Sequence, residues 1–116
     1  MKQFNKVKGD INEELAVNYL VNEKRFKIIE RNYKCQLGEI DIIAKEKDGT
    51  MVFVEVKYRR NTRFGYGREA VDQYKQQKIR NVATYYLRLR SKLQSKVKFA
   101  VIDILDDKIT FIDNAF

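Results

Sequence analysis

Three charged residues interrupt the most apolar part of the sequence, the stretch from Gly38 to Lys57 (GEIDIIAKEKDGTMVFVEVK). Its two arms are rich in Ile and Val, which favours strands, and Asp48-Gly49 between them favours a turn. Asp41 lies in the first arm, and Glu55 and Lys57 lie in the second. Charged side chains are seldom buried unless they are paired or bind a metal. The stretch therefore predicts a β-hairpin that holds two carboxylates and an ammonium group on a rigid scaffold.

The length of the hairpin loop decides whether the two carboxylates share a face of the sheet. With a two-residue turn at Asp48-Gly49, Asp41 would lie opposite Val56 and would face away from Glu55. A three-residue loop, 47–49, would place Asp41 opposite Glu55, and Gly49 suits the left-handed position that such a loop requires. A slip of one residue moves a side chain to the other face, so we expect the longer loop if the carboxylates cooperate.

The remaining hydrophobic pattern predicts one domain over residues 1–116, in the order α-β-β-β-α-β-β, with a mixed sheet of the α/β or α+β class. The predicted helices are Asp10–Glu23, with Asp10 as N-cap, and Arg68–Leu93. The predicted strands outside the hairpin are Phe26–Tyr33, at an edge of the sheet, Val97–Leu105 and Ile109–Ile112, the last two joined at Asp106-Asp107. The predicted core stripes are Ile11, Leu15, Ala16, Tyr19 and Leu20 in the first helix, and Val71, Tyr74, Ile79, Val82, Ala83, Tyr86 and Leu87 in the second.

The composition removes several classes of chemistry. The chain has no His and one Cys, which excludes Ser-His and Cys-His nucleophiles and zinc sites built from His or Cys. Hydrolysis would then depend on carboxylates, with or without an oxygen-preferring metal such as Mg²⁺ or Mn²⁺. The lone Cys35 fits a semi-buried structural residue in a reducing compartment. Because the sequence shows neither a signal peptide nor a membrane span, we expect a cytoplasmic protein.

Positive charge is concentrated in one half of the chain. The formal net charge is +8, and residues 57–98 contain 13 Lys or Arg against two acidic residues. Such a basic half favours a polyanionic partner, although a merely well-solvated surface would look the same. In the loop predicted over Tyr58–Gly67, Arg residues stand beside aromatic ones, and this combination suits contacts with phosphates and bases.

An Asp on one strand followed by Glu-x-Lys on the next is a known arrangement for cutting phosphodiesters. Asp41 and Glu55, with the backbone carbonyl of Val56, would supply hard oxygen ligands to the metal. The metal would lower the pKa of a bound water and stabilise charge on the phosphate oxygens. Lys57 would position the water or neutralise developing charge, and it points the same way as Glu55 because strand side chains alternate. By itself this pattern is weak, and its setting in paired apolar strands makes it moderately specific.

Beyond this pattern, the chain resembles the bacterial YraN-like family. The resemblance is carried by GEIDIIA, VFVEVKYR, RFGYGREAV, the helical stretch EELAVNYL and the C-terminal IDNAF, and it covers nearly the whole chain. That family is similar to the restriction-endonuclease-like PD-(D/E)xK superfamily, closest in style to Holliday-junction resolvases. The resemblance implies an α/β domain with a mixed sheet flanked by helices and a divalent-metal nuclease site. A resolvase-like enzyme would need two sites, which implies a homodimer.

Carried over position by position, the resemblance assigns metal and catalytic roles to Asp41, Glu55 and Lys57. Glu13, favoured over Glu14 by its spacing, matches a Glu of the first helix that often completes the site. Two positions depart from the family pattern, since Asn12 replaces a Gly and Ala100 replaces an Asp. The predicted nucleic-acid contacts are Arg59, Arg60, Arg63, Arg68, Lys75 and Lys78.

Three hypotheses follow from these residues. The first is a metal-dependent nuclease, with DNA favoured over RNA and branched or structured DNA among the candidate substrates. The second is a nucleic-acid-binding module that keeps the fold without significant turnover. The third is a buried ion-pair cluster with a purely structural role, which ranks last because buried ion pairs contribute little to stability.

Overall fold

The structure is a computed structural model that describes residues 2–59 and 71–116. Two helices and five strands follow one another as α1 (Lys2–Asn22), β1 (Lys27–Cys35), β2 (Gly38–Lys45), β3 (Met51–Arg59), α2 (Gln73–Leu89), β4 (Val97–Leu105) and β5 (Lys108–Ile112). The strands form one sheet in the order β1-β2-β3-β4-β5, in which β3 and β4 are parallel and the other pairs are antiparallel. The predicted α/β class, the mixed sheet and the element order are therefore confirmed.

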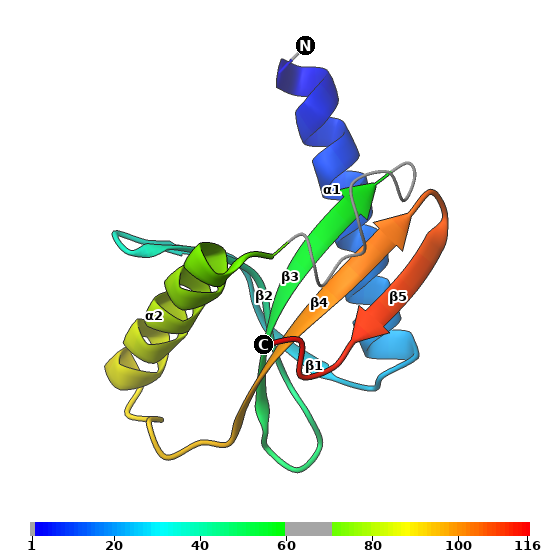
Figure 1. The fold of residues 1–116 in the computed structure, drawn as a ribbon. Coiled ribbons are helices and arrows are strands. Elements are labelled where there is room, and N and C mark those ends of the chain that lie inside the picture. The colour runs from blue at the N-terminus through cyan, green and yellow to red at the C-terminus, as the bar shows by residue number, and fades with distance from the viewer. Residues whose placement is uncertain (1, 60–70) are drawn as a thin grey trace.

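The helices cover opposite faces of the sheet, and each covers its own hydrophobic core (Figure 1). On the α1 face, Ala16 and Leu20 pack on alternate strand residues, which are Ile42, Ala44, Val52, Val54, Ala100, Ile102 and Ile104. On the α2 face, the helix contributes Ile79, Val82, Ala83, Tyr86 and Leu87 to a cluster with Phe53, Ile43 and Val101. Both faces of the central strands are thus buried, which explains their nearly continuous apolar sequence.

The β2–β3 hairpin has the predicted register. Lys45 pairs with Met51 and Ile42 pairs with Val54, and the amide of Glu46 donates to the carbonyl of Thr50 at 2.9 Å. Residues 47–49 therefore form the three-residue loop, and Gly49 has the expected positive φ, 96°. Continued by one residue, this register brings Asp41 level with Glu55, as the sequence predicted.

The first helix differs from the prediction at its start and in its buried stripe. It begins at Lys2 rather than Asp10, so Asp10 lies inside the helix and is not its N-cap. Ile11 and Leu15 are exposed (55% and 41%), whereas Ala16 and Leu20 are fully buried. The N-terminal turns extend beyond the sheet in Figure 1, and for that reason helical spacing alone overestimated the buried stripe.

The second helix is shorter than predicted at both ends. It runs from Gln73 to Leu89, and the Arg68 at which it was predicted to begin lies outside the described residues. Asp72 is its N-cap, and its carboxylate accepts a hydrogen bond from the amide of Lys75 at 2.8 Å. Tyr74, predicted to be in the core, is 75% exposed because it lies in the first turn, beyond the edge of the buried face.

The other strand predictions hold within a few residues. β4 has the predicted bounds, and β5 begins one residue earlier than expected, after the turn at Asp106-Asp107. β1 is an edge strand, as predicted. β3 continues through Tyr58 and Arg59, which were expected in a loop, and the rest of that loop lies outside the described residues. Neither helix, over the residues described, has the length and apolar character needed to span a membrane.

Candidate active site

The two strands of the central hairpin separate at Asp41. Their backbone pairing is recorded from Lys45–Met51 up to Ile42–Val54. One step further on, the amide of Val56 donates to Oδ2 of Asp41 at 2.8 Å, so a side chain takes the place of the backbone ladder. Beyond this point Ile40 packs with the α2 core, whereas Ile42 packs with the α1 core. The strand therefore turns toward α2 at Asp41, and the main chain of β3 fixes the position of that carboxylate.

Glu55 is the centre of the polar cluster. It is 8% exposed, and its Oε1 lies 2.9 Å from Nζ of Lys75 and 3.5 Å from Nζ of Lys57. Lys57 comes from the same face of β3, and Lys75 comes from the first turn of α2. Since Asp72 caps that turn through the amide of Lys75, the cap also fixes where the Lys75 side chain begins. Two carboxylates and two ammonium groups from three elements thus meet at one end of the sheet.

The pKa values of Asp41, Lys57 and Lys75 are perturbed in a way that suits a functional site. Burial, followed by the negative charge of Glu55, raises the pKa of Asp41 from 3.8 to about 6. Burial, together with the neighbouring Lys75, lowers the pKa of Lys57. Burial also acts to lower the pKa of Lys75, but its hydrogen bonds with Lys57 and Glu55 outweigh burial and raise the pKa overall. Burial is therefore the main reason that Asp41 holds a proton more tightly than an exposed carboxylate does.

The donor set fits a hard divalent cation. The oxygens of Asp41 and Glu55 are the ligand type that Mg²⁺ and Mn²⁺ prefer, and the backbone carbonyl of Val56 is the third donor that the sequence predicted. Within residues 2–59 and 71–116 no group of three acidic or thiol side chains lies close enough to hold a metal ion. Two carboxylates are nevertheless enough for Mg²⁺, which commonly takes one or two carboxylates together with water and substrate phosphates.

Glu13 lies where α1 crosses β1. Its Oε1 accepts hydrogen bonds from Nε of Arg31 at 3.2 Å and from Nδ2 of Asn32 at 2.9 Å, while Glu14 pairs with the other end of the Arg31 guanidinium at 3.0 Å. The Glu13 side chain is 13% exposed against 57% for Glu14, so Glu13 is the more enclosed of the two. The structure thus places Glu13 in a polar contact between α1 and β1, and its role in a metal site stays a prediction.

Arg59 was predicted to contact nucleic acid, but its guanidinium is occupied inside the protein. It forms a two-pronged ion pair with Asp103 on β4, with N–O distances of 3.0 and 2.6 Å, and the two side chains are 9% and 8% exposed. This geometry corrects the view of Arg59 as a surface phosphate contact. Arg60, Arg63 and Arg68 lie outside the described residues. Lys78 is exposed on α2, one turn after Lys75.

Asp103 and the contact of Lys75 with Glu55 are features that the sequence analysis missed. A signal for Asp103 was present, since an acidic residue inside the apolar stretch VKFAVIDIL is the same kind of anomaly as Asp41 and Glu55. The family pattern instead drew attention to Ala100, which is fully buried on the α1 face, away from the polar cluster. No local pattern links Lys75 to Glu55, because their contact depends on how α2 packs on the sheet.

Comparisons with known proteins agree with the resemblance found in the motifs. The model of the uncharacterised protein family UPF0102 matches residues 12–104. A UPF0102 protein of Clostridioides difficile is 47% identical over 114 residues, which cover 97% of this chain and 98% of the relative. A second, from Caldanaerobacter subterraneus subsp. tengcongensis, is 41% identical over the full length of both chains.

Two solved structures are similar at a lower level. A repair endonuclease from Pyrococcus abyssi matches with a TM-score of 0.47 and 21% identity, over 79% of this chain and 37% of that one. EndoMS, in a complex with double-stranded DNA, matches with a TM-score of 0.44 and 24% identity, over 76% of this chain and 33% of that one. The chain thus spans about a third of the length of either structure.

Proposed function

The chain belongs to the uncharacterised protein family UPF0102, and we propose that it is a divalent-metal-dependent nuclease that hydrolyses phosphodiester bonds of DNA, branched or otherwise structured DNA included. The observation that carries the proposal is the meeting of Asp41, Glu55, Lys57 and Lys75 where β2 separates from β3. Burial is the first cause that raises the pKa of Asp41 to about 6, and strongly perturbed groups of this kind gather at functional sites.

In the proposed reaction Asp41 and Glu55, with the carbonyl of Val56, would hold Mg²⁺ or Mn²⁺. When bound, the ion supplies a Lewis acid for the phosphate and lowers the pKa of a water. The hydrogen bond from the amide of Val56 keeps the Asp41 carboxylate oriented, which is the role of an outer contact to a metal ligand.

The two lysines act on the phosphate. Lys57 lies 3.5 Å from Glu55, on the same face of β3, and its lowered pKa makes its Nζ the better of the two at exchanging a proton with the attacking water. Lys75, whose pKa is raised, keeps its charge and neutralises the negative charge that develops on the phosphate oxygens. Both lysines contact Glu55 without substrate, and an incoming phosphate would compete for these contacts.

The substrate side of the proposal is supported by charge. Residues 57–98 carry the basic excess of the chain, Lys75 places part of that excess beside Glu55, and Lys78 is exposed one turn further along α2. A DNA backbone is the polyanion that such a surface attracts through release of counterions. Because a four-way junction has two strands to cut, we propose that the enzyme acts as a homodimer in the cytoplasm. Light scattering, with and without junction DNA, tests the dimer.

Cleavage of a labelled panel of linear, single-stranded, flapped and four-way DNA tests the activity, in Mg²⁺, in Mn²⁺ and in EDTA. Glu55→Gln keeps the size of the side chain and removes its charge, so we expect at least a ~100-fold loss of cutting with the fold intact. The matched control is Glu23→Gln, which changes an exposed carboxylate after α1 and should leave cutting unchanged.

The same panel decides against the alternative, a nucleic-acid-binding module without turnover. Binding of the panel with no cutting in either metal would establish that alternative and overturn the nuclease. Equal cutting by the wild type and Glu55→Gln would show that the activity does not come from this site.

A further inference from the structure

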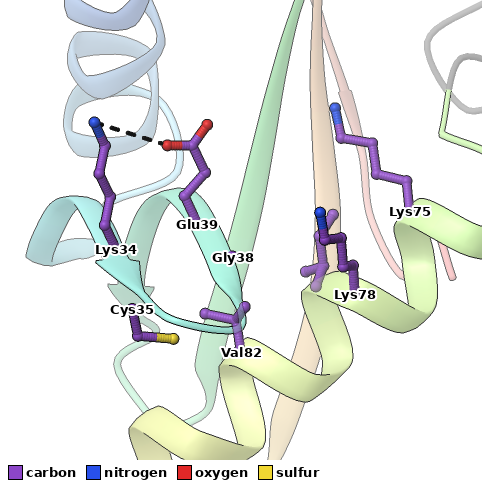
Figure 2. A pocket seen from close by; sticks show the side chains of 8 residues that line it. Lys34, Cys35, Gly38, Glu39, Lys75, Lys78 and Val82 are labelled. Atoms are coloured by element: carbon purple, nitrogen blue, oxygen red, sulfur yellow. Dashed lines mark ion pairs between the residues drawn. The ribbon is translucent and has the colours of Figure 1, made fainter.

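A pocket adjoins the active site, between the tip of the β1–β2 hairpin and α2 (Figure 2). Its volume is about 400 Å³, within the range of pockets that bind small molecules. The hairpin contributes Lys34 and Gly38 to its wall, and the helix contributes Lys75, Lys78, Ile79 and Val82. The pocket is therefore large enough for one nucleotide and is bordered by the same Lys75 that contacts Glu55.

The lining has two chemical parts. Ile79 and Val82 lie at its apolar base and are almost fully covered, at 4% and 0% exposed, because both also belong to the α2 core. Lys75 and Lys78 follow one another along α2 in Figure 2, and Lys34 stands on the opposite wall. Lys34 forms only a loose ion pair with Glu39, at 3.9 Å. Glu39 also lines the pocket, so the lining holds three lysines against one carboxylate, and this net positive charge suits a ligand that has a phosphate.

Gly38 lets the hairpin tip pack closely against α2 at one wall of the pocket. Its φ is +144°, a conformation that other residues rarely adopt, and a Cβ placed there would lie 3.2 Å from Cγ2 of Val82 and 3.9 Å from Cε of Lys78. Both of those atoms belong to pocket residues, so a larger residue would intrude on the pocket. Gly38 therefore packs directly against Val82, and the room for a ligand lies beside this contact.

We propose that this nucleotide pocket binds one unpaired nucleotide of the substrate, with its base in the cavity between the hairpin tip and α2 and its phosphate at Lys75 and Lys78. The inference rests on the proposed function and deepens it. Because Nζ of Lys75 lies 2.9 Å from Glu55, a phosphate held by Lys75 lies beside the carboxylates. The position of the bound nucleotide would therefore decide which neighbouring phosphodiester bond is cut.

The consequence is a substrate class. A base inside an intact duplex reaches a pocket only after unstacking and unpairing, which costs a few kcal/mol, whereas single-stranded, flapped or branched DNA presents an unpaired base at little cost. The enzyme should therefore prefer substrates with an unpaired nucleotide at the cut, independent of sequence, because the apolar base of the pocket offers no pattern of hydrogen bonds to read.

Binding without turnover tests the pocket directly. Thymidine 5′-monophosphate and inorganic phosphate are titrated separately into the protein in EDTA, while the methyl and amide NMR signals of Ile79 and Val82 are followed. We expect the nucleotide to shift these signals and to bind more tightly than phosphate. Equal affinities for the two probes would show a simple anion site, and no shift at Ile79 and Val82 would place the nucleotide elsewhere. Either result overturns the proposal.

Two charge reversals on the exposed surface provide the matched comparison. Lys78→Glu should weaken nucleotide binding by about tenfold or more, and should lower the preference for flapped over linear duplex DNA. Lys92→Glu makes the same change in net charge just beyond the other end of α2 and should leave both unchanged. If both variants weaken nucleotide binding equally, the net charge of the protein explains the effect, and the proposed pocket is overturned. If the nucleotide binds as expected but no DNA is cut in Mg²⁺ or Mn²⁺, the pocket stands and the nuclease fails.

Discussion

Asp41→Asn should stabilise the metal-free protein at neutral pH while destroying its metal site. The pKa of Asp41 is raised from 3.8 to about 6, so its native form holds a proton more tightly than the unfolded chain does. Stability therefore falls as the pH rises from about 4 to about 6 and stays lower above that range. A shift of about two units corresponds to about 3 kcal/mol. The side-chain oxygen of Asn can still accept the hydrogen bond from the amide of Val56, but this bond is weaker than the one to a carboxylate. The weaker bond reduces the gain in stability by about 1 kcal/mol.

Urea unfolding in EDTA at pH 4 and pH 7.5 provides the measurement. We expect the variant to be about 2 kcal/mol more stable than the wild type at the higher pH and to lose this advantage at the lower one. Adding Mg²⁺ should stabilise the wild type more than the variant, because a ligand that binds only the native state raises its stability. Asp107→Asn, in the exposed β4–β5 turn, is the control and should show neither effect. An Asp41→Asn protein that is destabilised equally at both pH values would refute the reasoning and make Asp41 a structural residue.

Three further predictions concern the rest of the fold and the basic surface. Arg59→Ala should cost about 3–5 kcal/mol in urea unfolding, because the buried carboxylate of Asp103 loses its ion-pair partner, and replacing both residues by apolar ones should recover much of that loss. Gly49→Ala should cost about 1–2 kcal/mol, because φ at this position is 96°; an unchanged unfolding midpoint would mean that the loop can adopt another turn. Lys78→Ala should reduce the slope of log affinity for DNA against log salt by about 1, and an unchanged slope would remove this lysine from the phosphate contacts.

The sequence predicted the elements best where local and long-range preferences agree. β4 was placed to the residue, because a run of nine residues with alternating Val, Ile and Phe ends at two Asp residues that suit a turn. The start of α1 was missed because residues 2–9 show little apolar periodicity and include Gly9. The part of a helix that extends beyond the sheet packs on no core, so its sequence requires no apolar periodicity. The start of α2 was missed because Val71 and Tyr74 stand at helical spacing to the true helix, although Asp72 caps it.

The relative placement of Asp41 and Glu55 was predictable for a specific reason. Strand alternation and the length of one loop decide which face each side chain takes, and Gly49 selected that length. The structure contains the three-residue loop 47–49, and the register that follows from it places Asp41 opposite Glu55. The positions of Lys75 and Asp103 depend instead on the packing of α2 and on the parallel pairing of β3 with β4, which no local pattern encodes.

Arg59 and Lys75 show why charge alone is ambiguous about function. Both are basic residues in the positive half of the chain, and both were predicted to contact nucleic acid. Arg59 meets an acidic residue that lies beside it in the sheet, and their buried pair ties the end of β3 to β4. Lys75 meets a carboxylate that it shares with Lys57, and its side chain remains 40% exposed and borders the nucleotide pocket. A basic residue is thus available to a polyanion when its internal partner is shared and its side chain still reaches solvent. This criterion favours Lys75 as the link between the carboxylates and the substrate.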